Sequence, residues 1–352
     1  MPEVLRGTLT WAWAYVQHVT VMFYWFWIPG VLVLGLLGTR YRSVSEEITR
    51  KQRKGAKASW AAIGWGMTSG AGRRTGLDTA RTLWDQGFSD HLVLAYLVAS
   101  QNLGLYSLLL FTVLIGLEFG LGVFLGGLVM IGLLRVLAPA RAPGRMLHAD
   151  ALEAAAGAPS PAATWMALVG SVEGFGSVVR DVGRYVRHVG LSLIGGLILG
   201  ALILTIDSEG YWVFPKWMGD EALGAALASS FLAPLLSLAF FLAPGGNLIV
   251  VSSIWKTWTL TYSGVISFVL ASLLNPMSVR ILLRHHGGSR GWLLVLAIYL
   301  SAALSGLAVA GLFALLGVQV THVPWFRDLV DKLLMLLPFT MLGAPGDGMQ
   351  GM

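Results

Sequence analysis

Residues 92–137 read LVLAYLVASQNLGLYSLLLFTVLIGLEFGLGVFLGGLVMIGLLRVL, and this stretch decides the fold class. It is apolar along nearly its whole length, apart from a polar interruption at Ser100-Gln101-Asn102. Apolar runs of about 20 residues are long enough to cross about 30 Å of hydrocarbon as α-helices. Apolar and polar residues do not alternate here, so the stretch predicts membrane-spanning helices rather than barrel strands.

The composition of the whole chain supports the same fold class. Of its 352 residues, 56% are hydrophobic and 12% are charged, whereas soluble domains carry about 25% charged residues. We therefore predict an all-α, polytopic membrane protein whose main partner is the lipid bilayer. The net charge is +6, but the cations gather in loops between apolar runs. This suits membrane topology better than nucleic-acid binding. The chain has no cysteine, so thiolate metal sites and disulfides are excluded, and no cofactor is expected.

The first apolar run, Trp11–Leu37, is too long for a cleaved signal peptide and lacks a small-residue cleavage site, so it predicts a retained span. The segment Thr39–Lys57 carries seven Lys or Arg residues against two Glu. We expect it to be a cytoplasmic loop, because positive loops stay inside. The protein is accordingly predicted to be multi-pass in the plasma (inner) membrane.

Two short apolar segments are interrupted by glycines. Ala58–Met67 is too short to cross, and Ser69-Gly70-Ala71-Gly72 and then Arg73-Arg74 follow it. Pro244-Gly245-Gly246-Asn247 is the corresponding break later in the chain. Short segments broken in this way are typical of re-entrant hairpins, which dip into the bilayer and return.

The two breaks belong to a repeat. Trp84 leads to an Ala-Ser pair at Ser100 followed by Asn102, and Trp255 leads to an Ala-Ser pair at Ser272 followed by Asn275-Pro276. The loop 207–221 holds four acidic residues and one lysine, opposite in charge to the first basic loop. We therefore predict an inverted-topology repeat with two re-entrant hairpins.

The predicted organisation has five parts. Residues 138–163 are rich in Ala, Pro and Gly and are typical of a linker. The next segment repeats apolar residues at steps of three and four, which predicts an amphipathic helix on the membrane, although a heptad-like pattern could also mean a homodimer contact. The parts are 1–137 (first membrane repeat), 138–163 (linker), 164–190 (amphipathic helix), 191–317 (second membrane repeat) and 318–352 (C-terminal interfacial helix and tail).

With these features the chain resembles the predicted permease family that includes the organoarsenical efflux permeases and the YraQ-type permeases. The resemblance covers about 24–137 and 188–317, and rests on a Gly/Pro break paired with a later Ala-Ser-x-x-Asn-Pro break. Members often carry a Cys-Ser-Cys-like element at the first hairpin, where this chain has Met67-Thr68-Ser69-Gly70. Trivalent arsenic prefers thiolate ligands, so the resemblance implies a permease architecture and a site position rather than an arsenical substrate.

The hairpin tips and the later breaks are expected to meet near the membrane midplane, where free helix ends can bind a small-molecule or ion substrate. The predicted substrate-binding residues are Thr68, Ser69, Gly70, Arg73, Arg74, Asn102, Pro244, Gly245, Gly246, Asn247, Asn275 and Pro276. The two arginines would bind an anion or act in gating if they lie at the midplane, or would reach the interface if the hairpin is shallow. Alternatively, the glycines only permit close packing and the asparagines cap helices.

The leading functional hypothesis is a secondary permease for a small polar or anionic solute. The sequence has no phosphate-binding loop ending in Gly-Lys-Ser/Thr, and no His-Glu-x-x-His or Gly-x-Ser-x-Gly motif. A membrane-embedded enzyme and a non-transporting channel or scaffold subunit are the alternatives. Residues 280–290 carry Arg280, Arg284 and Arg290 and are predicted to be a second basic, cytoplasmic loop. His285-His286 lies in this loop without further ligand residues beside it, so it does not predict a metal site.

Overall fold

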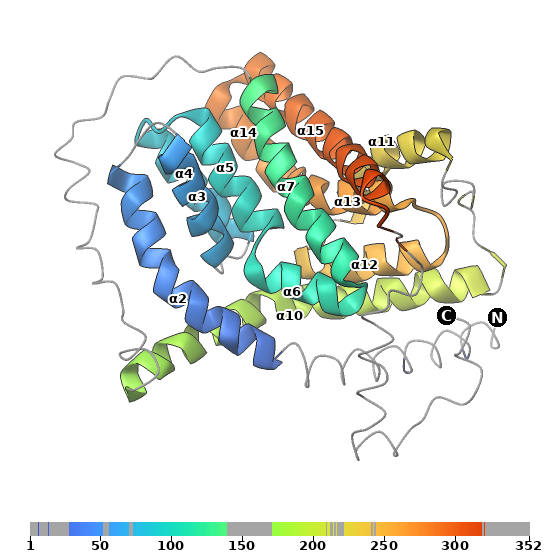
Figure 1. Ribbon diagram of the computed structural model, residues 1–352, viewed down its shortest axis with the longest axis horizontal. Coiled ribbons are helices and arrows are strands. Elements are labelled where there is room, and N and C mark those ends of the chain that lie inside the picture. Colours follow the sequence, from blue (N-terminus) through green and yellow to red (C-terminus); the bar gives the residue numbers. More distant parts are fainter. Residues whose placement is uncertain are drawn as a thin grey trace.

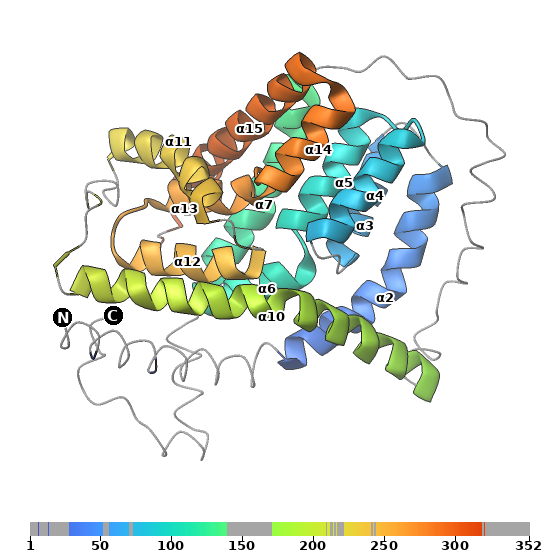
Figure 2. The ribbon, with the colours of Figure 1, turned by 180° about the vertical axis from the view of Figure 1, so that it is seen from behind.

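The computed structural model describes residues 6, 13, 28–51, 56–69, 73–138, 171–208, 210–211, 214, 216, 222–240, 242, 244–318 and 320. Within these residues the secondary structure is helical, without a β-strand. Helices from the two halves of the chain pack into one bundle (Figures 1 and 2). The predicted linker and C-terminal tail lie almost entirely outside the described residues, and the division into five parts stays a prediction.

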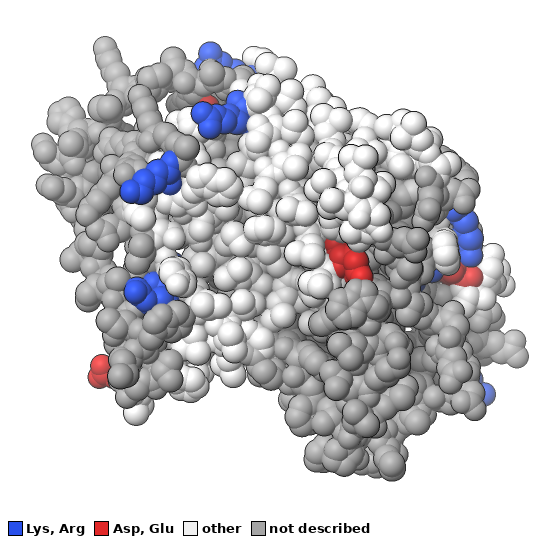
Figure 3. Space-filling view, in the orientation of Figure 1, with Lys and Arg blue, Asp and Glu red and all other residues white. Residues whose placement is uncertain are grey.

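Three described helices are long and apolar enough to cross a membrane: α7 (Leu117–Leu137), α11 (Leu223–Phe240) and α15 (Gly288–Leu315). Two bent helix pairs raise this number to five if each pair counts as one span. Figure 3 shows that the face over α7 and α15 is almost free of charged side chains, as a lipid-facing surface requires. The prediction of an all-α, polytopic membrane protein is confirmed.

In the described part of the first half, α2 (Ile28–Lys51) corrects the prediction of a loop from Thr39 onward. The helix continues because the segment holds few helix breakers and places Glu46 and Glu47 four residues before Arg50 and Lys51, a spacing that favours helix. Thr49 is fully buried and donates a hydrogen bond from Oγ1 to the carbonyl of Ser45, one turn earlier (2.7 Å). The basic residues up to Lys51 therefore lie on a helix.

The first hairpin consists of α3 (Ala56–Thr68) and α4 (Arg73–Asp85), and only Ser69 of the connection is described. With 13 residues, α3 spans about 20 Å, too little to cross the hydrocarbon. It packs tightly against α5 (Asp90–Asn102), where a Cβ on Gly66 would lie 2.6 Å from the carbonyl oxygen of Tyr96. This close approach needs a glycine and fixes α3 beside α5.

The polar interruption in the opening stretch marks a break in a span. Helix α5 ends at Asn102, and α6 (Leu105–Leu114) begins three residues later at an angle of 40°. The unbroken α7 follows after Gly116 and runs back through the bundle. The sequence prediction of a break at Ser100-Gln101-Asn102, followed by a span, is confirmed.

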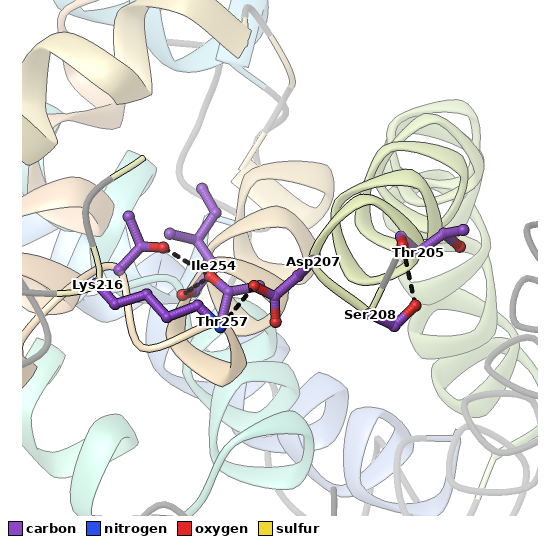
Figure 4. Close-up of polar contacts among 7 residues, drawn as sticks. Thr205, Asp207, Ser208, Lys216, Ile254 and Thr257 are labelled. Carbon is purple, nitrogen blue, oxygen red and sulfur yellow. Dashed lines mark hydrogen bonds and ion pairs between the residues drawn. The ribbon is translucent and has the colours of Figure 1, made fainter. Parts of the chain in front are cut away.

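In the second half, α10 (Val172–Ser208) is one helix of 37 residues. It joins the predicted amphipathic helix to the span expected after it, without a break at 190. At its end the Asp207 carboxylate pairs with Lys216 Nζ (3.0 Å), and Ser208 Oγ donates to the Thr205 carbonyl (2.9 Å), as Figure 4 shows. This ion pair neutralises one charge of the predicted acidic loop.

The second hairpin consists of α11 and α12 (Pro244–Lys256). Helix α11 ends at Phe240 and α12 begins at Pro244, so the four predicted break residues lie in the first turn of α12. This corrects the predicted position, because Pro244 opens the helix, a place that suits a residue without a backbone N–H. Helix α11 has 18 residues and is long enough to span, whereas α3 has 13. That both hairpins are re-entrant stays a prediction.

A second broken span follows. Helix α13 (Tyr262–Leu270) continues into a 3-10 turn, η3 (Ala271–Leu273), and α14 (Pro276–His286) departs at 55°. The segment around Arg284 was predicted to be a loop, but α14 runs through it to His286. Only Gly287, with φ of 79°, separates α14 from α15. A left-handed residue of this kind turns the chain sharply, which glycine permits.

The two halves interlock at the centre. Helices α7 and α15 pack along each other, and α7 also contacts α13. Outside this pair the contacts are reciprocal: α4 of the first hairpin packs on α14, and α12 of the second hairpin packs on α6. Each hairpin therefore touches the second arm of the broken span in the other half, an arrangement typical of a two-fold repeat.

Candidate functional site

A small cavity lies where the two broken spans approach each other. Its volume is about 10 Å³, which is room for about one water molecule. Its polar lining residues come from both halves, and the described lining contains no charged side chain. The lining consists of Gln101, Asn102, Ser107, Leu108, Phe111, Val123, Asn247, Leu248, Val269 and Ser272.

Helix ends supply most of this lining. Gln101 and Asn102 form the last residues of α5, and Ser107 lies in the first turn of α6. Asn247 lies in the first turn of α12, and Ser272 lies in η3. Free N–H and C=O groups at helix ends can bind a solute without water, so the breaks in the helices place backbone polarity around the cavity.

Asn102 joins the two breaks. Its Nδ2 donates to the carbonyl of Leu270 (2.8 Å), and its Oδ1 accepts a hydrogen bond from Ser272 Oγ (2.7 Å). Asn102 is 3% exposed, and an unpaired amide at that depth would be costly. The side chain therefore holds the two broken spans together while it lines the cavity.

Asn247 differs from Asn102 in its hydrogen bonding. Its side chain is 3% exposed, and its Oδ1 has no hydrogen-bond partner in the described structure. Buried polar atoms are nearly always paired, so an unpaired one that lines a cavity points to an absent partner. Asn247 Oδ1 is thus a buried acceptor without a partner at the cavity.

The helix ends also set the electrostatics of the cavity. The first turns of α6 and α12 both border it, through Ser107 and Asn247. Helix N-termini carry partial positive charge, whereas the C-terminal end of α5 at Asn102 contributes carbonyl groups with partial negative charge. The cavity therefore offers donors and acceptors to a polar solute, and two helix N-termini to a negative group.

The first hairpin contributes less to the described site than the sequence suggested. Thr68 Oγ1 donates to the Gly64 carbonyl (2.7 Å), and Ser69 Oγ donates to the Gly66 carbonyl (2.8 Å). Neither residue lines the cavity. Both hydroxyls satisfy the end of their own helix, a common use of Ser and Thr.

Three further predicted residues of the first hairpin are only partly described. Gly70 lies outside the described residues. Arg73 and Arg74 open α4, but their side chains are not described. One turn later, a Cβ on Gly76 would lie 2.5 Å from Nε2 of the cavity residue Gln101. The start of α4 is therefore next to the cavity.

The second hairpin places its predicted residues in different environments. Gly246 is buried against α10, and its backbone N–H donates to Ser192 Oγ (3.1 Å). Gly245 is also buried, and Pro244 is the first residue of α12. Of the four predicted residues, only Asn247 lines the cavity.

The last predicted pair lies at the start of α14. Asn275 is its N-cap: Oδ1 accepts from the backbone N–H of Ser278 (3.0 Å). Pro276 is the first helical residue and is exposed. Neither lines the cavity, so the capping alternative describes Asn275 well.

Sequence reasoning missed Gln101, Ser107 and Ser272 as lining residues. Ser272 carried a signal, because it is the repeat counterpart of Ser100. Gln101 directly precedes the predicted Asn102. Ser107 carried no signal, because it lies inside an apolar run and only the bend after Asn102 brings it to the cavity.

Metal binding has no support in the described part of the chain, where no group of three or more His, Asp or Glu residues could hold an ion. His285 and His286 instead contact Trp84, at ring-centroid distances of 5.2 and 5.0 Å. The two histidines therefore serve packing between the halves.

These observations define an all-α, polytopic membrane protein with a polar cavity between two broken spans. The profile of the family described as "Predicted permease" matches residues 9–311. The chain belongs to this family, as its sequence resemblance predicted, and the family points to a membrane transporter rather than an enzyme.

A curated relative supports the same class. The Mycobacterium tuberculosis protein named "Putative permease Rv2963" is 24% identical to this chain over 275 residues. The match covers 72% of this chain and 65% of the relative, so the chain spans just under two thirds of that protein. No solved structure matches the chain.

Proposed function

We propose that this permease moves a small polar or anionic solute through the cavity between its two halves. One observation carries the proposal: Asn247 Oδ1 is buried, unpaired and part of the lining of a cavity between the broken spans. Solute sites in transporters commonly use broken helices near the midplane. A donor on the solute would pair with Asn247, and helix ends would bind its other polar groups.

An anionic group on the solute has two sources of attraction. The N-terminal turns of α6 and α12 border the cavity with partial positive charge. The start of α4, which carries Arg73 and Arg74, lies one turn from Gly76 beside Gln101. A guanidinium that reaches a water-poor cavity attracts an anion strongly. These features support the anionic subclass over a purely neutral solute.

An inverted repeat provides a mechanism of alternating access. The reciprocal contacts of α4 with α14 and of α12 with α6 support a two-fold relation between the halves. In such a repeat, one half rocks against the other and exposes a fixed site to each side in turn. The cavity between the breaks is the site that we assign to this movement.

Flux into proteoliposomes tests the proposal. Osmotic swelling would be measured with urea and glycerol as neutral probes, and with potassium acetate, phosphate and sulfate plus valinomycin as anionic probes. We expect at least one probe to enter faster than into protein-free liposomes. Asn247→Leu keeps the side-chain size but removes the polarity, and should slow that probe by about tenfold or more.

The control is Asn275→Ser, which removes an amide outside the cavity and retains a good N-cap. It should leave the flux unchanged. Equal flux in wild type and Asn247→Leu, with both proteins inserted, would contradict the assigned site. Loss of flux in Asn275→Ser alone would place the path elsewhere.

A further inference from the structure

We propose that Trp84 and Trp255 are the two gates of the transport path, one at each end, and that they open in alternation. The proposal rests on the function proposed above, because a gate needs a path to close. It concerns two residues that line no part of the cavity.

The two tryptophans occupy the same position in the repeat. Each is the twelfth residue of a 13-residue helix that follows a hairpin break: Trp84 in α4 (Arg73–Asp85) and Trp255 in α12 (Pro244–Lys256). They are buried, with exposed fractions of 3% and 5%. Each hairpin thus ends in one buried tryptophan.

Trp84 closes against the other half of the chain. Its ring stacks on His285 (centroids 5.2 Å apart, planes 23° apart) and meets the edge of His286 (5.0 Å, 90°). His285 Nδ1 also lies 3.6 Å from Asp85 Oδ1 on α4. These contacts join the end of the first hairpin to the junction of α14 and α15.

Trp255, in the second half, makes the corresponding contact with the first half. Its ring meets Phe119 edge-on, at a centroid distance of 5.1 Å and an angle of 69°. Phe119 in turn contacts Phe111 (6.0 Å), which lines the cavity. The end of the second hairpin therefore closes on the junction of α6 and α7, directly beside the cavity.

The two contact clusters lie at opposite ends of the bundle core. Helices α7 and α15 run in opposite directions beside each other (Figures 1 and 2). Phe119 lies at the start of α7, and His286 lies just before the start of α15. With 21 residues, α7 is about 30 Å long, close to the thickness of the hydrocarbon layer. One cluster therefore closes each end of the path.

Both clusters are formed in this structure, which corresponds to an occluded arrangement. Trp84 Nε1 is buried without a hydrogen-bond acceptor in the described residues. Buried indole N–H groups usually have an acceptor, so water that enters on opening would satisfy this donor. The closed contact thus leaves one polar group unpaired, which favours reopening.

Side-specific labelling tests the gates without any solute. Ser107→Cys places a single thiol at the cavity of this cysteine-free chain. A membrane-impermeant maleimide would be added to inside-out or right-side-out vesicles. Loss of the ring contacts in Trp84→Ala should raise the labelling rate about tenfold from the side of His285 only. Trp255→Ala should raise it from the opposite side only.

Matched variants exclude general loosening. Trp60→Ala and Trp258→Ala remove exposed tryptophans, 63% and 51% accessible, and should leave both labelling rates unchanged. Trp84→Phe and Trp255→Phe retain a ring and should label like the wild type. The proposal would be overturned if either alanine variant raised the labelling rate from both sides of the membrane, or if it raised the rate from neither side.

The two proposals fail in different ways. If labelling is side-specific as expected but no probe shows flux, the gate proposal is supported and the proposed solute class is contradicted. If flux depends on Asn247 but the labelling rate does not change in Trp84→Ala or Trp255→Ala, the solute site is supported and the gate proposal is contradicted.

Discussion

Ser272 and Asn102 connect the breaks of the two bent spans through a hydrogen bond of 2.7 Å from Ser272 Oγ to Asn102 Oδ1. The same amide donates to the carbonyl of Leu270 over 2.8 Å. A broken helix leaves carbonyl groups without their usual partners, and here the opposite half supplies one. Both the nitrogen and the oxygen of the Asn102 side chain therefore bond to the opposite half, whereas Asn247 Oδ1 has no partner in the described structure.

This connection predicts a measurable coupling between the two residues. Asn102→Ala should destabilise the protein by about 1–3 kcal/mol, because it leaves the Leu270 carbonyl buried without a donor. A double-mutant cycle with Ser272→Ala should give a coupling energy of about 0.5–1.5 kcal/mol. Unfolding in detergent, followed by circular dichroism, measures both. Additive effects would mean that the hydrogen bond contributes nothing to stability.

Glycine packing gives a second prediction. A Cβ on Gly246 would collide with the backbone carbonyl oxygen of Ser192 on α10, so Gly246→Ala should cost about 1–3 kcal/mol through overpacking. Gly311 on α15 is the control, since nothing lies within 4 Å of its added Cβ. Gly311→Ala should be neutral or slightly stabilising. Melting temperatures in detergent compare the two, and equal shifts would contradict the close contact.

Topology gives a third prediction. Single cysteines replacing Arg53 and Arg284 should be labelled from one side of the membrane, and a cysteine replacing Glu209 from the other, because positively charged segments beside the spans stay cytoplasmic. An impermeant thiol reagent on oriented vesicles measures this directly. Labelling of positions 53 and 209 from the same side would exclude the inverted repeat.

The sequence predicted the breaks well but not the helix ends. Polar residues inside an apolar run are rare enough to mark the break at Asn102 within a few residues. Charged segments gave no such signal: α2 continues to Lys51 and α14 to His286, because Arg, Lys and Glu favour helix as readily as loop.

The candidate site was predictable only where the repeat was visible. Asn102 and Asn247 flank breaks in the two halves, and both line the cavity. Asn275 also flanks a break, yet it caps α14, and a single sequence does not distinguish a cap from a ligand. Ser107 depends on the 40° bend between α5 and α6, a tertiary feature without a sequence signal.

The last prediction concerns the charge at the start of α4. Arg73→Gln with Arg74→Gln should weaken the binding of an anionic solute by about tenfold or more, because a charge near a water-poor cavity is poorly screened. Both residues lie on the first turn of α4, next to Gly76 and the cavity residue Gln101. The measurement is the concentration dependence of anion flux in proteoliposomes, with neutral probes in parallel.

The histidines of α14 provide the contrast. His285→Gln with His286→Gln alters the proposed gate contact with Trp84, outside the cavity, so it should affect anionic and neutral probes alike. The arginine variant should raise the half-saturation concentration for anions but not for neutral probes, since only anions lose an attraction. Normal anion flux in the arginine variant would leave a permease for neutral solutes. A selective loss of anion flux in the histidine variant, with neutral flux retained, would place the anion-attracting charge at α14 instead.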